Sequence, residues 1–116
     1  MTTTPQHMTA LATANVRRKA RSSLKHQVHD TGSFPGGCTE LADILAAGAP
    51  SCMQSMRVEE AMRWLWHHGR SIDRFIDETL ELVGCSEWKL IGELTVRQRS
   101  VLVNLLRAEA GERKAA

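Results

Sequence analysis

The chain has 116 residues, which is enough for one domain with a modest hydrophobic core but leaves few residues to line a deep catalytic pocket. Its apolar content of 42% and net charge of +2 are ordinary for a globular domain, and no apolar run approaches the roughly 20 residues that cross a bilayer. Three widely spaced cysteines and the lack of a secretory signal peptide favour reduced thiols in a cytoplasmic protein.

The charges are distributed unevenly along the chain. The first acidic residue is Asp30, so residues 1–29 carry five basic side chains and no acidic one. Residues 30–116 hold ten basic and thirteen acidic side chains, a balance of −3. This asymmetry favours a polyanionic partner for the N-terminal part, although a solvated helix without acidic residues is the simpler alternative.

The N-terminal part is predicted to be a tail followed by a basic helix. Residues 1–8 are polar and Thr-rich, which predicts a disordered tail, and residues 9–29 have the spacing of a helix. Apolar side chains in this helix are few and small, whereas basic ones surround much of its circumference. We expect a helix that is held weakly by any core and steadied by an anionic partner.

A loop and several short helices are predicted to follow. Residues 30–38 contain three glycines and a proline and are predicted to be a loop, after which Thr39 would cap a helix that ends near Gly48. Ser51 begins a further turn. Residues 56–65 place apolar side chains on one face, as expected of a core helix.

The centre of the segment 58–82 is a turn around Gly69 between two predicted helices, the second capped by Ser71. The N-terminus of the second helix would present unpaired N–H groups, for which a phosphate oxygen is a natural occupant. Arg70 in the turn and Arg74 one turn further would add positive charge beside it. An ordinary helical hairpin with Gly69 as its C-cap is the alternative.

The last part of the chain is predicted to be one more helix and a tail. Gly84 ends the preceding helix, and Thr95 with Gln98 has the pattern of a capping box. Arg97 and Arg99 lie in the first turns of the last helix, where cations oppose the helix dipole unless an anion binds there. Residues 111–116 are predicted to be a tail. The predicted fold class is all-α, with four to five short helices in the domain 39–110.

No pattern of residues supports an enzyme, a metal site or a cofactor. His67 and His68 are adjacent and therefore do not share a helix face, and no further ligand lies at a recognisable spacing. The sequence also lacks a nucleotide-binding glycine loop and a nucleophile–base signature. Trp64 and Trp66 point to different sides of their helix, so we expect one to be buried and the other to reach the surface.

Several short motifs follow one another in a fixed order between residues 14 and 106. They are the basic cluster Arg17-Arg18-Lys19-Ala20-Arg21 with Leu24-Lys25, the stretch Leu41 to Leu45, Met56-Arg57-Val58, Gly69-Arg70, Leu80-Glu81, and Arg97-Gln98-Arg99 with Leu102, Leu105 and Leu106. Together these motifs resemble the actinobacterial-type integration host factors, which are small nucleoid-associated DNA-binding proteins. The resemblance implies a long N-terminal helix packed on a helix–two-turn–helix domain similar to that of ribosomal protein S13.

The resemblance also implies contacts with the phosphates of double-stranded DNA and little sequence preference. The DNA-binding candidates are Arg17, Arg18, Lys19, Arg21, Lys25, Gly69, Arg70, Arg74, Lys89, Arg97 and Arg99. This chain has Trp66-His67-His68-Gly69-Arg70 in place of the family's Pro-Lys-Val-Gly-Lys-like turn, and Trp88 to Gly92 in place of an Arg-Arg-x-Arg-Gly cluster. These departures indicate a divergent member, such as a phage-encoded or paralogous version.

The sequence therefore predicts a monomeric, nucleoid-associated protein that binds the backbone of duplex DNA and affects its architecture. A host nucleoid or recombination protein is a possible further partner, and a membrane is not. The alternative is a protein-interaction module, for example one that modulates or imitates a host DNA-binding protein. RNA binding, by analogy with ribosomal protein S13, is a third interpretation.

Overall fold

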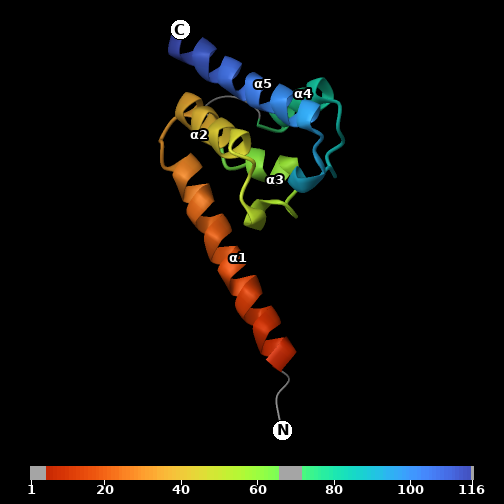
Figure 1. Ribbon diagram of the computed structural model, residues 1–116. Coiled ribbons are helices and arrows are strands. Elements are labelled where there is room, and N and C mark those ends of the chain that lie inside the picture. The colour runs from red at the N-terminus through yellow and green to blue at the C-terminus, as the bar shows by residue number, and fades with distance from the viewer. Residues whose placement is uncertain (1–4, 66–71, 116) are drawn as a thin grey trace.

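The computed structural model in Figure 1 describes residues 5–65 and 72–115 of the chain. In this part the protein is all-α, and the only β pairing is an isolated antiparallel bridge between Arg57 and Leu90. The elements are α1 (Pro5–His29), α2 (Phe34–Ala46), the 3-10 turn η1 (Ser51–Met53), α3 (Val58–Met62), α4 (Ile72–Val83), the 3-10 turn η2 (Ile91–Glu93) and α5 (Val96–Ala115). The predicted fold class, a long first helix packed on a compact helical domain, is confirmed.

α1 is longer than the sequence analysis predicted. It begins at Pro5, so residues 5–8 belong to the helix and not to a disordered tail, while residues 1–4 lie outside the described part. Proline fits the first turn of a helix because the N–H group it lacks has no partner there, and no glycine or further proline interrupts the chain before residue 29.

α2 also begins earlier than predicted, which shortens the loop at residues 30–38. Ser33, not Thr39, is the N-cap, and its hydroxyl accepts a hydrogen bond of 3.0 Å from the backbone N–H of Gly36. Pro35 lies in the first turn, where it breaks no helical hydrogen bond. Gly37 is buried, and a Cβ atom there would lie only 3.2 Å from Leu65 Cδ2, so this glycine allows α2 to pack closely.

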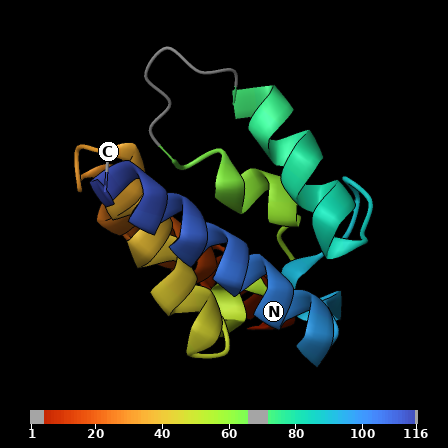
Figure 2. The same ribbon diagram turned by 90° about the horizontal axis from the view of Figure 1, so that it is seen from above.

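The core lies mainly between α2 and α5, which pack along each other in Figure 2. The side chains of Leu41, Leu45, Leu102 and Leu106 are at most 1% exposed. α4 adds Phe75, whose ring meets Phe34 edge-on with 5.2 Å between the ring centroids. The buried side chains of these helices recur three and four positions apart, which is the spacing of an amphipathic helix.

α3 is shorter than the core helix predicted over residues 56–65, because the chain turns after Met62. Its buried face is nevertheless the one predicted. The segment before α3 runs beside the segment that leads into η2, and three backbone hydrogen bonds join them: Val58 N–H to Lys89 O (3.0 Å), Ile91 N–H to Met56 O (2.8 Å) and Gly92 N–H to Gln54 O (2.9 Å).

The ends of α4 and α5 are formed partly as predicted. Gly84 ends α4 with a φ of +83°, which a residue without Cβ adopts without strain. At the start of α5, Gln98 N–H donates to Thr95 Oγ1 and Thr95 N–H donates to Gln98 Oε1, both at 3.0 Å, which confirms the capping box. α5 continues to Ala115, so the predicted tail at residues 111–116 is wrong as far as residue 115, because the residues that follow Gly111 favour a helix.

Replacing Thr95 by Ala is expected to lower the free energy of unfolding by about 1 kcal/mol, because the N–H of Gln98 loses its acceptor. Urea denaturation followed by circular dichroism measures this change. Thr95→Ser keeps the hydroxyl and is expected to restore most of the loss. An unchanged midpoint in Thr95→Ala would show that the cap does not stabilise α5.

Candidate nucleic-acid interface

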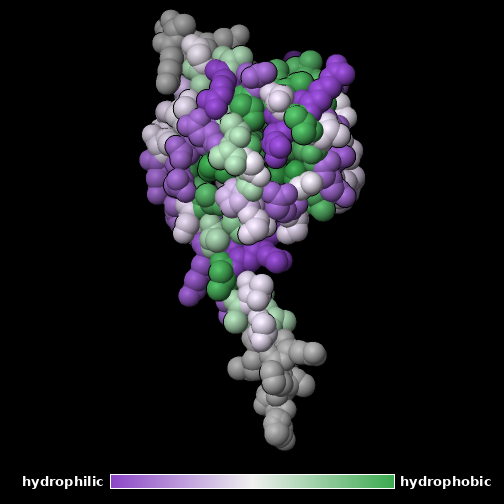
Figure 3. All heavy atoms as spheres, in the orientation of Figure 1, coloured by the Kyte–Doolittle hydropathy of each residue, from purple (hydrophilic) through white to green (hydrophobic). Residues whose placement is uncertain are grey.

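The N-terminal half of α1 projects from the domain. In Figures 1 and 3 the helix leaves the domain at one side and stands clear of it, and the molecule measures 64 × 29 × 24 Å. All side chains from Thr9 to Lys19 are exposed, whereas Ala20, Leu24 and Val28 pack against the core. We call residues 9–19 the arm and residues 30–115 the domain.

The arm and the residues next to it carry positive charges without acidic partners. Arg17, Arg18, Lys19 and Lys25 are all exposed, and none of them makes an ion pair or a side-chain hydrogen bond within the described residues. Their side chains are therefore available to an external anion. The charge asymmetry of the sequence favoured an anionic partner for this helix. The structure adds that the basic part of the helix projects into solvent.

Most described arginines of the domain are instead paired with carboxylates. Arg57 bonds Glu60 at 3.3 Å, Arg63 bonds Glu59 at 3.2 Å and Asp73 at 2.8 Å, and Arg107 bonds Asp43 at 3.0 Å. The hydrogen bonds that Arg63 donates to Asp73 and Glu59 raise the pKa of its guanidinium above the usual value. These pairs neutralise one another. Among the described side chains, the basic residues without a carboxylate partner lie on α1, apart from Lys89, Arg97 and Arg99.

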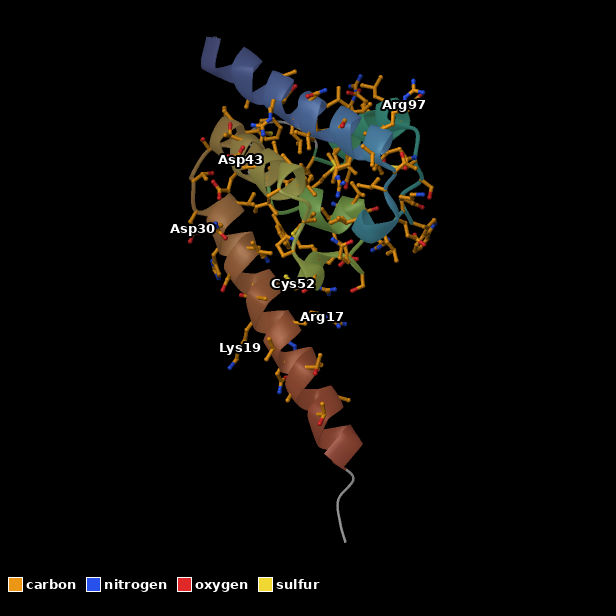
Figure 4. The ribbon with its side chains drawn as sticks, viewed as in Figure 1. Arg17, Lys19, Asp30, Asp43, Cys52 and Arg97 are labelled. Atoms are coloured by element: carbon orange, nitrogen blue, oxygen red, sulfur yellow. The ribbon has the colours of Figure 1, made fainter. Side chains whose placement is uncertain are left out.

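The basic side chains point in different directions around α1. Arg18 and Lys25 are seven residues apart, so they lie within about 20° of each other around the helix axis. Lys19 and Arg17 point to opposite sides of α1 in Figure 4. The four cations cover about 200° of the circumference of α1, so a phosphate backbone on that side of the helix would meet at least one of them.

Arg21 differs from its neighbours, because its guanidinium is bound to the domain. Its Nε donates to the carbonyl oxygen of Cys52 at 2.5 Å, and its Nη2 donates to the hydroxyl of Ser55 at 2.6 Å. The side chain is half-buried. The phosphate contact expected of Arg21 would compete with these two hydrogen bonds.

The turn predicted to hold a phosphate lies outside the described residues, and with it Trp66, Gly69, Arg70 and Ser71. The same is true of His67 and His68. Arg74 is described: it lies in the first turn of α4, is exposed and pairs with Glu78 at 3.0 Å. An acidic partner of this kind reduces the charge that Arg74 offers to a phosphate.

The basic residues near α5 lie away from the arm. Figure 4 places Arg97 near the top of the domain and Arg17 below it, where α1 leaves the domain. Arg99 lies in a shallow groove of about 280 Å³ between α5 and the end of α2. These arginines therefore do not share a surface with the arm, because α5 runs along the side of the domain farthest from it. The resemblance places Arg97 and Arg99 beside the surface of the Gly69 turn, and this placement stays a prediction because that turn lies outside the described residues.

Lys89 is half-buried beside Cys85 in the segment that leads into η2. Burial raises the pKa of the Cys85 thiol, and the positive charge of Lys89 opposes this rise. The three cysteines are free thiols, of which Cys38 and Cys52 are buried. Among the described residues no cluster of three or more His, Cys, Asp or Glu side chains has the arrangement of a metal site.

Trp88 is an exposed tryptophan that was not expected from the sequence, whereas Trp66, one of the two considered there, lies outside the described residues. Trp64 is 8% exposed and belongs to the core, while Trp88 is 68% exposed and its ring lies 5.1 Å from the guanidinium carbon of Arg57. This distance is that of a cation–π contact. The polar neighbours Ser86, Glu87 and Lys89 were the signal that could have placed Trp88 at the surface.

In the described part of the chain, α1 and the other helices are too short or too polar to cross a membrane. Comparisons with protein-family models, with characterised proteins and with solved structures give no match. The class of protein that the geometry defines is a small helical domain with a projecting basic arm.

Proposed function

We propose that the protein binds the sugar-phosphate backbone of double-stranded DNA through its arm and the nearby Lys25, with little sequence preference. It would thereby act as a nucleoid-associated, integration-host-factor-like protein that affects DNA architecture. The observation that supports this proposal is the exposure of four basic side chains without acidic partners on a projecting helix: Arg17, Arg18, Lys19 and Lys25. Phosphate contacts carry no sequence information, which is the reason for the weak preference.

The dimensions of the basic segment suit duplex DNA. Arg17 and Lys25 are separated by about 12 Å along the helix axis, since each residue adds about 1.5 Å. Duplex DNA carries one negative charge per roughly 1.7 Å of its axis, so a stretch of duplex as long as this segment carries about seven phosphates for its four cations. The major groove, about 12 Å wide, also admits an α-helix, whose diameter with side chains is about 10–12 Å.

A second argument concerns the stability of the arm. An isolated helix shorter than about 12–15 residues is marginal in water, and the arm has no buried side chain to stabilise it. Neutralisation of its positive charges by phosphates removes their mutual repulsion. DNA would therefore stabilise the helical arm as well as being bound by it.

The test is duplex affinity measured over a series of salt concentrations, by fluorescence anisotropy with two duplexes of unrelated sequence. Four phosphate contacts predict that log K falls with log salt with a slope of about −3.6. The two duplexes are expected to bind about equally well. No binding at about 50 mM salt, or an affinity that does not change with salt, would contradict the proposal.

A protein-interaction module is the second candidate function. The outer face of α4 favours it, because Asp77 and Glu81 are exposed there next to Leu82, which is 67% exposed. The exposed Trp88 is a further side chain of the kind that protein partners cover. Failure to bind duplex DNA at low salt would favour this candidate.

A further inference from the structure

Arg21 lies in α1 where the arm meets the domain, one helical turn after Arg17. Its two hydrogen bonds reach residues that are 31 and 34 positions away in the sequence, Cys52 and Ser55. Because the donors are Nε and Nη2 of one planar guanidinium, the two bonds restrict both the position and the orientation of the side chain. Arg21 therefore joins α1 to the region around η1 by two bonds.

The acceptors of these bonds belong to a region that is itself well anchored. Cys52 is 8% exposed, and the adjacent Met53 is completely buried. The side-chain amide of Gln54 donates to the carbonyl oxygen of Ala49 at 2.9 Å, and Gln54 O accepts from Gly92 N–H at 2.9 Å. The acceptors of Arg21 thus lie on a turn that is bound to the chain on both sides.

Further contacts hold the C-terminal half of α1. Val28 is completely buried, Gln27 donates to Glu40 at 3.2 Å, and a ring nitrogen of His29 lies 3.3 Å from the carbonyl oxygen of Trp64. These contacts fix one end of the packed segment of α1, and Arg21 fixes the other. Two separated attachment points determine the direction of a helix, whereas one attachment point allows it to pivot.

We infer that Arg21 is a positioning residue, which holds the arm in a fixed direction relative to the domain and does not itself bind a phosphate. This inference rests on the proposed function as far as DNA is concerned, but the effect on the direction of the arm is independent of DNA. A pre-oriented arm loses less conformational entropy on binding than a pivoting one, so Arg21 raises the affinity indirectly.

The variants Arg21→Lys and Ser55→Ala test this inference, with Arg107→Lys as the matched control. Lysine keeps the positive charge but cannot donate the two hydrogen bonds in the planar geometry of the guanidinium. Ser55→Ala removes one acceptor without changing any charge. We expect Arg21→Lys and Ser55→Ala to lower duplex affinity by about threefold to fivefold with an unchanged salt slope. Arg107→Lys is expected to bind within about twofold of the wild-type protein, because α5 lies away from the arm and lysine can keep the ion pair with Asp43.

The direction of the arm is measured without DNA by the distance between two spin labels. The labels are attached to the exposed positions of Ala12→Cys and Leu82→Cys in a Cys85→Ser background, in which Cys38 and Cys52 are buried. We expect a broader distance distribution in Arg21→Lys and Ser55→Ala, and an unchanged one in Arg107→Lys. Circular dichroism confirms that each variant is folded.

Each outcome distinguishes the inference from the proposed function. An unchanged distance distribution in both Arg21→Lys and Ser55→Ala would overturn the positioning role, whatever the DNA affinity. A broader distribution with wild-type affinity and salt slope would show that the direction of the arm does not matter for DNA. If the wild-type protein does not bind DNA, the proposed function fails, and the distances alone decide whether Arg21 positions the arm.

Discussion

Replacing Arg17, Arg18 and Lys19 together by alanine is expected to lower duplex affinity by about two to three orders of magnitude at 0.1 M salt. Each phosphate contact adds about 0.9 to log K for every tenfold decrease in salt concentration. Because 0.1 M is tenfold below the 1 M reference, the loss of three contacts lowers log K by about 2.7 at this concentration. The salt slope is expected to change from about −3.6 to about −0.9, because Lys25 remains. Fluorescence anisotropy over the same salt series measures both quantities.

The matched control removes three positive charges from the domain. Arg74, Arg97 and Arg107 are exposed and lie on α4 and α5, so replacing them by alanine changes the net charge by the same amount. Two of them already pair with carboxylates, Arg74 with Glu78 and Arg107 with Asp43. We expect this variant to bind within about threefold of the wild-type protein. Equal losses in both triple variants would show that net charge, and not the arm, determines binding.

The arm variant is also expected to remain folded. Alanine has the highest helix propensity, and the three replaced side chains are exposed and make no side-chain bond within the described residues. The far-ultraviolet circular dichroism of this variant should therefore be at least as helical as that of the wild-type protein. A loss of DNA binding with retained helix content assigns the effect to the missing charges.

The parts of the fold that the sequence predicted are those that depend on local patterns. The buried faces of α2, α4 and α5 follow from apolar residues three and four positions apart, and the capping box at Thr95 follows from two residue types at a fixed spacing. The starts of α1 and α2 were misjudged, because polar, Thr-rich residues in the first case and glycines with a proline in the second suggested non-helical chain. Pro5 and Pro35 both lie in first turns, where proline is compatible with a helix.

The candidate site was predicted only in part, because some of its features depend on how the helices pack and not on the local sequence. Arg17, Arg18 and Lys19 were identified from the charge asymmetry, which is a property of the sequence alone. Their role as binding candidates does not depend on a contact within the protein. Arg21 has the same sequence context, but its two acceptors come from η1 and the residues after it, which are brought to α1 only by the packing of the domain. The separation of Arg97 from the arm likewise depends on how α5 packs, which no local pattern contains.

Leu102→Ala is expected to lower the free energy of unfolding by about 3 kcal/mol, because it opens a cavity in the centre of the core between α2 and α5. The side chain of Leu102 is completely buried, whereas that of Leu82 is 67% exposed. Leu82→Ala is the matched control, because it makes the same substitution within a helix and therefore has a similar effect on helix propensity.

We expect Leu82→Ala to change the free energy of unfolding by no more than about 0.5 kcal/mol, since the side chain that it removes is largely exposed to solvent already. Urea denaturation of both variants measures the difference. Below its unfolding transition, Leu102→Ala should still bind duplex DNA with the wild-type salt slope, because the phosphate contacts belong to the arm and not to the core. A changed slope in folded Leu102→Ala would show that the domain contributes phosphate contacts of its own. Similar losses of stability in both variants would contradict the placement of the core between α2 and α5.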